Sequence, residues 1–346
     1  MLLVSAACTA ALILGRRWHI RLTGDAPDES HHKVHTATVP RVGGIAVYSA
    51  GLTGLALLSP TLPDLTAKIL WMLWGCLTIV FVAGLMEDLT RAVPAALRYA
   101  VAIGAALLFS VAHDGYGISS IGISPFDHAF NLTPIRIGLF AFAVASVSHG
   151  FNLIDGQNGL CSGTSILIFT ALGTTAAHTG QAPLASLSYG MAAANLGFFA
   201  FNFPFGRIFL GDGGAYFNGA VAGAIAVMVV QGSSTVSPWF AVLVLIYPIW
   251  ETIFSMARRW HASRPFYLPD RDHLHHRLRH RISGVRAAGR DYSSLPILAC
   301  VAVAAVIASS VGDRTELLLA GITVFVAIYL WAYQNLAPRH APATTH

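Results

Sequence analysis

The chain has 346 residues, of which 55% are hydrophobic and only 11% are charged, and its formal net charge is +5. Soluble domains usually carry about a quarter charged residues, so this composition excludes an ordinary soluble protein and indicates an integral membrane protein. The four cysteines (Cys8, Cys76, Cys161, Cys300) stand singly in apolar runs and give no sign of a disulfide framework or a cysteine metal site.

Eleven apolar runs approach the length of about 20 residues that a membrane-spanning helix needs. In chain order they are 1–15, 42–60, 68–86, 95–112, 135–151, 161–178, 184–203, 215–232, 236–256, 294–312 and 315–335. The sequence therefore predicts an all-α polytopic membrane protein with about 11 transmembrane helices, organised as one domain over 1–337. A polar arm at about 257–293 interrupts the apolar runs, and 338–346 is expected to be a disordered cytoplasmic tail.

The basic residues divide unequally between the two faces of this arrangement. Odd-numbered runs end on one face, and every Lys and Arg lies near that face except Lys68, Arg136 and Arg314. Because loops rich in Lys and Arg stay in the cytoplasm, this face is predicted to be cytoplasmic. The N-terminus is then expected outside, with the C-terminus and the polar loops of the odd face in the cytoplasm.

Acidic residues recur where apolar runs end on the cytoplasmic face. Glu87 and Asp88 stand side by side after the third run. Because adjacent carboxylates repel each other, they are either well solvated or share a cation. Asp212 lies between glycines in the stretch FLGDGGAYFNG. A carboxylate where a membrane segment meets water is a candidate site residue, although a helix N-cap is the ordinary alternative.

The loop SHGFNLIDGQNGL combines a polar helical face with two turns. His149, Asn152 and Asp155 are spaced so that they can share one face of a helix. Asp155-Gly156 and Asn158-Gly159 then predict two tight turns whose backbone amides can meet a ligand.

Basic motifs occupy two further loops on the same face. The segment 31–44 reads HHKVHTATVPRVGG, in which Lys33 and His35 offer donors, with a solvated basic loop as the alternative. The arm contains a compact cluster formed by His273, His275, His276 and Arg277. No cysteine and no convincing fourth ligand accompany these histidines, so donors for phosphate oxygens explain the cluster better than a zinc site.

Together these groups predict phosphoryl transfer at a membrane surface. Oxygen ligands such as Asp88, Asp212 and Asn152 suit Mg²⁺, and the basic groups suit a diphosphate. One substrate would be a lipid phosphate and the other a soluble nucleotide. The alternatives are a secondary transporter and an inactive scaffolding relative, but a transporter favours ionisable groups near the middle of the bilayer, where this sequence has almost none. Glu251 is either a site residue or a partner of Arg258 or Arg259.

Three motifs, NLIDGQNGL, FLGDGGAYFNG and DHLHHRL, resemble those of the polyprenyl-phosphate N-acetylhexosamine-1-phosphate transferases, as does the weaker K-x-H…P-R-x-G-G pattern. The resemblance covers Lys33 to Arg277. It implies a bacterial inner-membrane enzyme that transfers a sugar 1-phosphate, expected to be GlcNAc 1-phosphate, from a UDP-N-acetylhexosamine to undecaprenyl phosphate. UMP would be released and Mg²⁺, or Mn²⁺ in its place, would be the cofactor. Such enzymes start O-antigen, common-antigen or teichoic-acid-type polysaccharides. A homodimer is one expected assembly, and no nucleic acid is expected as a partner.

The resemblance also implies roles for individual residues. Asp212 would be a Mg²⁺ ligand with Asn152 beside it, and Asp88 would organise charge or act as a base, paired with Glu87. Two further groups would contact the substrates: Asp155, Gly156, Asn158 and Phe209 at the uridine, and Lys33, His35, His273, His275, His276 and Arg277 at the phosphates or the sugar. Of these, Asp88, Asp212, Glu87 and Asp155 are the catalytic candidates.

This chain departs from the family pattern at several positions. Glu87 stands where Asp is usual, Arg91 replaces a further acid, His149 replaces an Asn, and Asn158 replaces an Asp. The first-loop sequence PRVGG, in place of P-T-M-G-G, favours the amino-sugar branch over the pentapeptide branch.

Overall fold

The computed structural model describes residues 1–25, 38–263, 272–282 and 290–336. Its first half contains α1 (Leu2–Leu14), α2 (Arg16–Thr23), β1 (Gly24–Asp25), β2 (Val39–Pro40), α3 (Gly44–Leu58), η1 (Ser59–Thr61), α4 (Asp64–Thr90), α5 (Ala95–Ala112), α6 (Ser124–Asp127), η2 (His128–Asn131) and α7 (Thr133–Ile154). Its second half contains α8 (Leu160–His178), α9 (Ala182–Asn202), α10 (Gly211–Gln231), α11 (Pro238–Val244), α12 (Ile246–His261), α13 (Leu274–Ile282), α14 (Leu295–Ser310) and α15 (Thr315–Asn335).

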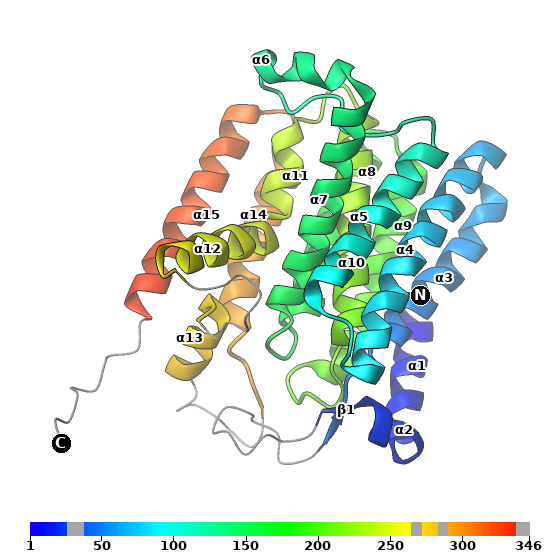
Figure 1. Ribbon diagram of the computed structural model, residues 1–346, viewed down its shortest axis with the longest axis vertical. Coiled ribbons are helices and arrows are strands. Elements are labelled where there is room, and N and C mark those ends of the chain that lie inside the picture. Colours follow the sequence, from blue (N-terminus) through cyan, green and yellow to red (C-terminus); the bar gives the residue numbers. More distant parts are fainter. Residues whose placement is uncertain (26–37, 264–271, 283–289, 337–346) are drawn as a thin grey trace.

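The long helices form one bundle of roughly parallel and antiparallel rods (Figure 1). Within the described residues, eight helices are long and apolar enough to cross a membrane, or nine if the bent pair α11 and α12 forms one span. This confirms the predicted class of all-α polytopic membrane protein. All eleven predicted runs coincide with helices, but α1 and α14 are shorter than a full span, so the count of 11 spans stays a prediction.

The span predicted over 236–256 is broken in the structure. The chain turns by 77° between α11 and α12, and α12 lies across the bundle in Figure 1. Pro248 explains the break, because a proline ring collides with the carbonyl of the residue four positions earlier. That residue is Val244, where α11 ends.

Helix α10 is the centre of the bundle, with 94% of its apolar window buried. Its many small residues let neighbouring backbones come close, as is usual where membrane helices pack. A Cβ atom at Gly214 would lie 2.7 Å from the Cα of Gly44 in α3. Halfway along the helix, the buried side chains of Asn218 and Asn195 (in α9) donate to each other at 2.7 and 3.1 Å. This pair satisfies both amides without placing a charge inside the bundle.

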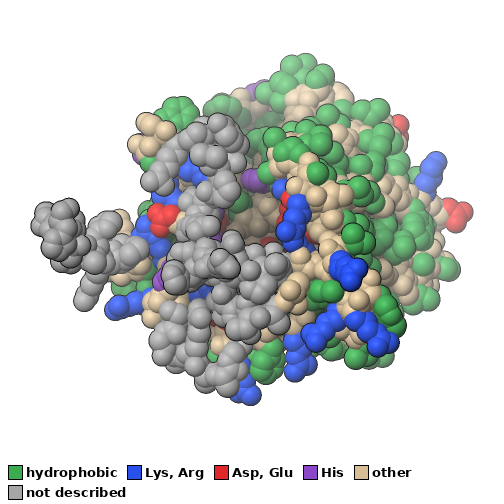
Figure 2. All heavy atoms as spheres, turned by 60° about the horizontal axis from the view of Figure 1, so that its bottom comes forward, with side chains coloured by type: hydrophobic (Ala, Val, Ile, Leu, Met, Phe, Trp, Pro, Cys, Tyr) green, Lys and Arg blue, Asp and Glu red, His purple; other side chains and the backbone are tan. Residues whose placement is uncertain are grey.

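One end of the bundle gathers the polar elements. The antiparallel pair β1 and β2 lies there with Gly24 opposite Pro40, and α2 and α13 lie at the same end (Figure 1). Seen from that end, basic side chains surround a hollow in which acidic side chains are visible (Figure 2).

Candidate active site

Asp88 joins the end of α4 to the start of α10. Its side chain is 1% exposed, and its two oxygens accept the backbone N–H groups of Asp212 and Gly213, each at 2.9 Å. The first N–H groups of a helix lack partners inside the helix, and a carboxylate there satisfies them and the helix dipole. Asp88 therefore caps α10 from another helix. The alternative that Asp212 is the N-cap is wrong, because α10 begins at Gly211 and Leu210 occupies the cap position.

Glycines make this junction possible. Gly211 has φ +78°, and a Cβ atom there would lie 2.1 Å from the carbonyl oxygen of Arg41 and 2.6 Å from an Asp88 oxygen. A Cβ atom at Gly84 would lie 2.7 Å from the backbone of Asp212. The glycines around Asp212 thus allow the close approach of backbones that the sequence predicts.

Two arginines balance the two acids. Arg41 donates from Nε to Asp88 at 3.3 Å and from Nη2 to Asp212 at 3.4 Å. Arg98, which is 8% exposed on α5, pairs with the other oxygen of Asp212 and lies over the ring of Tyr216. Neither arginine was predicted to be a site residue, although Arg41 belongs to the P-R-x-G-G motif.

Asp155 adds a third carboxylate to this cluster. It follows α7 directly and accepts a hydrogen bond from the backbone N–H of Gly211. Protein atoms surround the carboxyl group, and this desolvation, together with the charge of Asp88, raises its pKa well above the ordinary value, while Arg41 opposes the shift. The predicted convergence of acids from three separate loops is therefore present at Asp88, Asp155 and Asp212.

Glu87 takes no part in this convergence. Its carboxylate accepts the backbone N–H of Val93 at 2.7 Å and so holds the connection between α4 and α5. Asp88 contacts α10 instead, so the two adjacent acids engage different elements.

The remaining polar residues of α7 have different surroundings. His149 contacts the hydroxyl of Tyr216 at 3.2 Å through Nδ1. Asn152 is partly exposed in the last turn of α7, near the acids in sequence, and its predicted place beside a metal stays a prediction.

The turn after α7 is held by the elements around it. Asn158 is 7% exposed, and its side chain donates to the carbonyl of Pro204 at 3.2 Å. Gly159 has φ +75° and donates its N–H to the side chain of Asn202 at 2.6 Å. Phe209 lies on the neighbouring segment, where its backbone pairs with Pro40 and Gly43. The predicted contact of Asn158 and Phe209 with a uridine stays a prediction.

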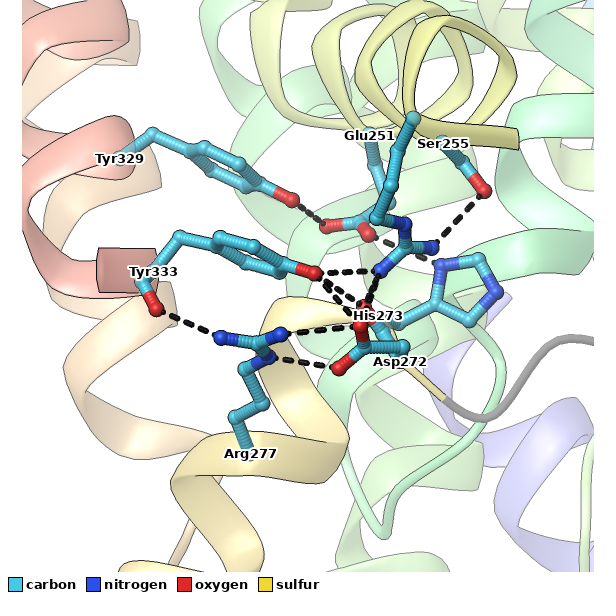
Figure 3. A network of polar contacts seen from close by, with 8 residues as sticks. Glu251, Ser255, Asp272, His273, Arg277, Tyr329 and Tyr333 are labelled. Atoms are coloured by element: carbon cyan, nitrogen blue, oxygen red, sulfur yellow. Dashed lines mark hydrogen bonds and ion pairs between the residues drawn. The ribbon is translucent and has the colours of Figure 1, made fainter. Parts of the chain in front are cut away.

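The described part of the arm is helical, so the expectation of a loop-like arm is wrong for α13. His273 is 4% exposed, and its Nδ1 lies 2.9 Å from a carboxylate oxygen of Glu251. The other oxygen of Glu251 accepts the hydroxyl of Tyr329 at 2.8 Å. Figure 3 shows Glu251 between these two residues. Through these contacts Glu251 ties α12 to the residue that precedes α13 and to α15, and its two predicted alternatives stay predictions.

Arg277 takes part in the same network. It donates to both oxygens of Asp272 at 2.6 and 2.9 Å and to the carbonyl of Tyr333 at 2.9 Å. These bonds outweigh burial and lower the pKa of Asp272. Arg258 also pairs with Asp272, at 3.2 Å (Figure 3). In this structure Arg277 anchors α13, and its predicted role as a phosphate donor stays a prediction.

His275 faces the turn after α7. It is 1% exposed and packs so closely on Gly156 that a Cβ atom there would lie 2.4 Å from its Nε2. Among the described residues, neither ring nitrogen has a hydrogen-bond partner. Burial, with the nearby charges of His276, His273 and Arg279, lowers its pKa well below the ordinary 6.5. His276 lies beside it, with 4.3 Å between ring centroids. Lys33 and His35 lie outside the described residues.

The arrangement can hold anions and a hard cation together. Among the described residues, no group of three or more His, Cys, Asp or Glu side chains is arranged to hold a metal ion by itself. Mg²⁺ needs only one or two protein carboxylates when substrate phosphates supply further oxygens. The oxygen donors of Asp212 and Asp155, beside two guanidinium groups, fit such a shared site.

Comparison with known proteins gives consistent matches. Residues 70–230 match the sequence model described as "Glycosyl transferase family 4". A "probable undecaprenyl-phosphate N-acetylglucosaminyl 1-phosphate transferase" of Bacillus subtilis is 28% identical over 257 residues, covering 74% of this chain and 70% of the relative. An "undecaprenyl-phosphate alpha-N-acetylglucosaminyl 1-phosphate transferase" of Yersinia pestis is 25% identical over 334 residues, covering 94% and 86%. The Escherichia coli K12 protein of the same name is 27% identical over 292 residues, covering 82% and 74%.

Proposed function

We propose that the chain is a member of glycosyl transferase family 4, whose sequence model matches residues 70–230, and that it transfers N-acetylglucosamine 1-phosphate from UDP-N-acetylglucosamine to undecaprenyl phosphate. UMP is the second product. The names of the relatives support the acceptor and the transferred group. The lipid-linked sugar phosphate formed here would start a cell-envelope polysaccharide.

One observation carries this proposal: Asp88, Asp155 and Asp212 converge with Arg41 and Arg98 at one end of a bundle of membrane helices. The lipid acceptor can reach such a site from the bilayer, and the nucleotide can reach it from water. Phosphoryl transfer needs positioning and charge neutralisation more than covalent catalysis, and this cluster offers both signs of charge.

The transfer reaction balances without a general base from the protein. An oxygen of undecaprenyl phosphate forms a bond to the β-phosphorus of the UDP-sugar, and the bond from that phosphorus to the bridging oxygen breaks. The electron pair leaves with UMP. A phosphate monoester is already largely ionised at neutral pH, so no proton has to be removed from the acceptor. Arg41 and Arg98, now paired with the acids, are the donors available to phosphate oxygens.

We assign Mg²⁺ to Asp212 and Asp155, with Asn152 as a further oxygen ligand, and Mn²⁺ is an alternative cation. Bound there, the cation would neutralise charge on the diphosphate. Asp88 organises this site through α10 and Arg41, because its oxygens already accept two backbone N–H groups and a guanidinium. The raised pKa of Asp155 fits a carboxylate that a cation would ionise.

The proposed setting is the bacterial inner membrane with the acid cluster on the cytoplasmic face. The placement of Lys and Arg along the sequence supports this orientation. A homodimer remains part of the proposal, to be checked by the mass of the purified protein in detergent.

The test is a donor panel with purified protein, undecaprenyl phosphate and Mg²⁺. UDP-GlcNAc, UDP-GalNAc and UDP-MurNAc-pentapeptide are supplied separately, and UMP and the lipid product are measured together. We expect UMP and lipid-linked sugar phosphate in equal amounts with UDP-GlcNAc, and loss of both with EDTA. Asp212→Asn is the matched control. No lipid product with any donor would refute the transferase assignment and favour the transporter or scaffold alternatives.

A further inference from the structure

Helix α2 presents an unusual surface where α1 ends. Arg16, Arg17 and Arg21 are all exposed, and none of the three has an ion-pair partner in the described part of the chain. Trp18 is 77% exposed and Leu22 is 68% exposed. The guanidinium of Arg17 lies over the Trp18 ring, 4.7 Å from its centroid. Cations without an ion-pair partner among the described residues thus share one short helix with large apolar side chains.

The two sides of α2 have different surroundings. Trp18 and Leu22 are four residues apart and share a face, and Arg17 and Arg21 form the neighbouring row. On the protein side, His19 contacts the hydroxyl of Thr23 at 2.7 Å and the carbonyl of Leu12 at 2.9 Å. The inner face is therefore satisfied by the protein, whereas the outer face has no partner within the described chain.

A membrane surface fits this outer face better than a soluble partner. Figure 1 places α2 at the polar end of the bundle, directly after the apolar helix α1. Tryptophan and arginine side chains are typical of the headgroup level, where the ring stays near the acyl chains and the cation meets phosphate. Each arginine near an anionic leaflet strengthens binding by about fivefold.

The end of α2 is bonded directly to the candidate active site. The carbonyl of Thr23 accepts the backbone N–H of Arg41 at 2.9 Å. The next carbonyl, that of Gly24, accepts Arg91 Nη2 at 2.6 Å. The side chain of Arg41 is the one that contacts both Asp88 and Asp212. A force that holds α2 in place therefore also holds the backbone of Arg41.

We propose that α2 binds the headgroups of anionic phospholipids in the surrounding leaflet and thereby fixes Arg41 against the two acids. The occupant is the bulk anionic lipid, not the polyprenyl phosphate acceptor. The proposed binding of lipid depends only on the contacts and exposure of α2, whereas the expected effect on the rate rests on the proposed transferase function.

The test compares two double variants in nanodiscs of phosphatidylcholine with and without phosphatidylglycerol. Arg17→Gln/Arg21→Gln removes the cationic row of α2. Lys68→Gln/Arg314→Gln is the matched control, because it removes two exposed cations at the starts of α4 and α15. The end of α15 contacts α13 at the polar end, so its start lies at the other end of the bundle. Melting temperatures verify that both variants fold.

The first readout is the phosphatidylglycerol that stays with the protein after extraction, measured by mass spectrometry. We expect the α2 variant to retain about 25-fold less, from two arginines at about fivefold each, and the control to match wild type. Equal retention in all three proteins would overturn the lipid site. A changed oligomeric mass with unchanged lipid retention would also overturn it and point to a second copy as the occupant.

The second readout is the initial rate of UMP release. In wild type and control the rate should rise with phosphatidylglycerol, whereas the α2 variant should keep its rate in pure phosphatidylcholine and lose the rise. A higher KM for undecaprenyl phosphate in the variant in pure phosphatidylcholine would show that α2 binds the acceptor, which contradicts the proposal. If no protein releases UMP in any lipid, the transferase function fails, while the retention measurement still decides the lipid site.

Discussion

Replacing Asp88 by Asn should cost stability as well as activity. The Asp88 side chain is 1% exposed, and its two oxygens accept the N–H groups of Asp212 and Gly213 as well as Nε of Arg41. Asparagine has the same shape but only one acceptor oxygen. Its amide NH₂ must therefore face a donor, either at the start of α10 or on Arg41.

The size of the effect follows from these contacts. A buried N–H group left without an acceptor costs about 1–3 kcal/mol, and loss of a negative charge at a helix N-terminus costs about 0.3–2 kcal/mol. The expected loss for Asp88→Asn is therefore about 2–4 kcal/mol. Asp212→Asn removes the same charge, but the Asp212 carboxylate is 17% exposed and, among the described residues, pairs with Arg41 and Arg98. Asparagine at 212 keeps one acceptor oxygen for these arginines and leaves no N–H group at the start of α10 without an acceptor, so the loss of stability should be smaller than for Asp88→Asn.

The assay is thermal unfolding of the metal-free protein in one detergent, together with initial rates of UMP release. One kcal/mol shifts the melting temperature by about 2–4 °C for 150–250 residues and by less in a longer chain, so Asp88→Asn should melt several degrees below Asp212→Asn. Both should lose about 10²- to 10³-fold in rate, and Glu87→Asp should lose much less. Equal melting temperatures for Asp88→Asn and Asp212→Asn would refute the role of Asp88 as a cap.

Three further predictions follow from other parts of the structure. A raised pKa means that folded Asp155 keeps its proton above the ordinary value of 3.8, so its contribution to stability is lost as pH rises through the folded pKa. Metal-free Asp155→Asn should therefore have a higher melting temperature than wild type at pH 8, and this difference should close toward pH 4. Equal melting temperatures at pH 8 would contradict the pKa shift. Glu251→Gln leaves a buried network with a missing acceptor and should lower stability by about 1–3 kcal/mol, whereas exposed Glu316→Gln should not, as thermal unfolding of the two variants will show. Single cysteines at Ser263 and Ser119 in a cysteine-free background should react with an impermeant reagent from opposite sides of the membrane, and labelling from one side would contradict the predicted orientation.

Much of the fold could be predicted because the length of each apolar run in the sequence gives the length of a membrane helix. The run 95–112 matches α5, and 161–178 differs from α8 by one residue. Hydropathy does not show the direction in which each helix runs, so the turn between α11 and α12 was not predicted. A signal was present in Pro248, whose ring excludes a continuous helix through Val244.

The candidate site was predicted less completely, because contacts between distant loops leave little trace in a single sequence. The approach of Asp88, Asp155 and Asp212 could be expected, since each follows or precedes an apolar run on the same face. The arginines could not, because Arg41 and Arg98 look like ordinary basic residues of a cytoplasmic loop. The role of Glu251 depends on α12 lying across the bundle, which no local pattern reveals.

Adjacency in sequence is a poor guide to shared chemistry at this site. Successive residues of an α-helix point about 100° apart, so Glu87 and Asp88 point in different directions while α4 stays helical through Thr90. Asp88 faces α10, and Glu87 faces the N–H of Val93. Asp155, bonded to Gly211 beside Asp212, is therefore the candidate for a second carboxylate in the proposed cation site. This geometry explains how the chain can carry Glu where Asp is usual, because the longer side chain reaches a backbone partner outside the acid cluster.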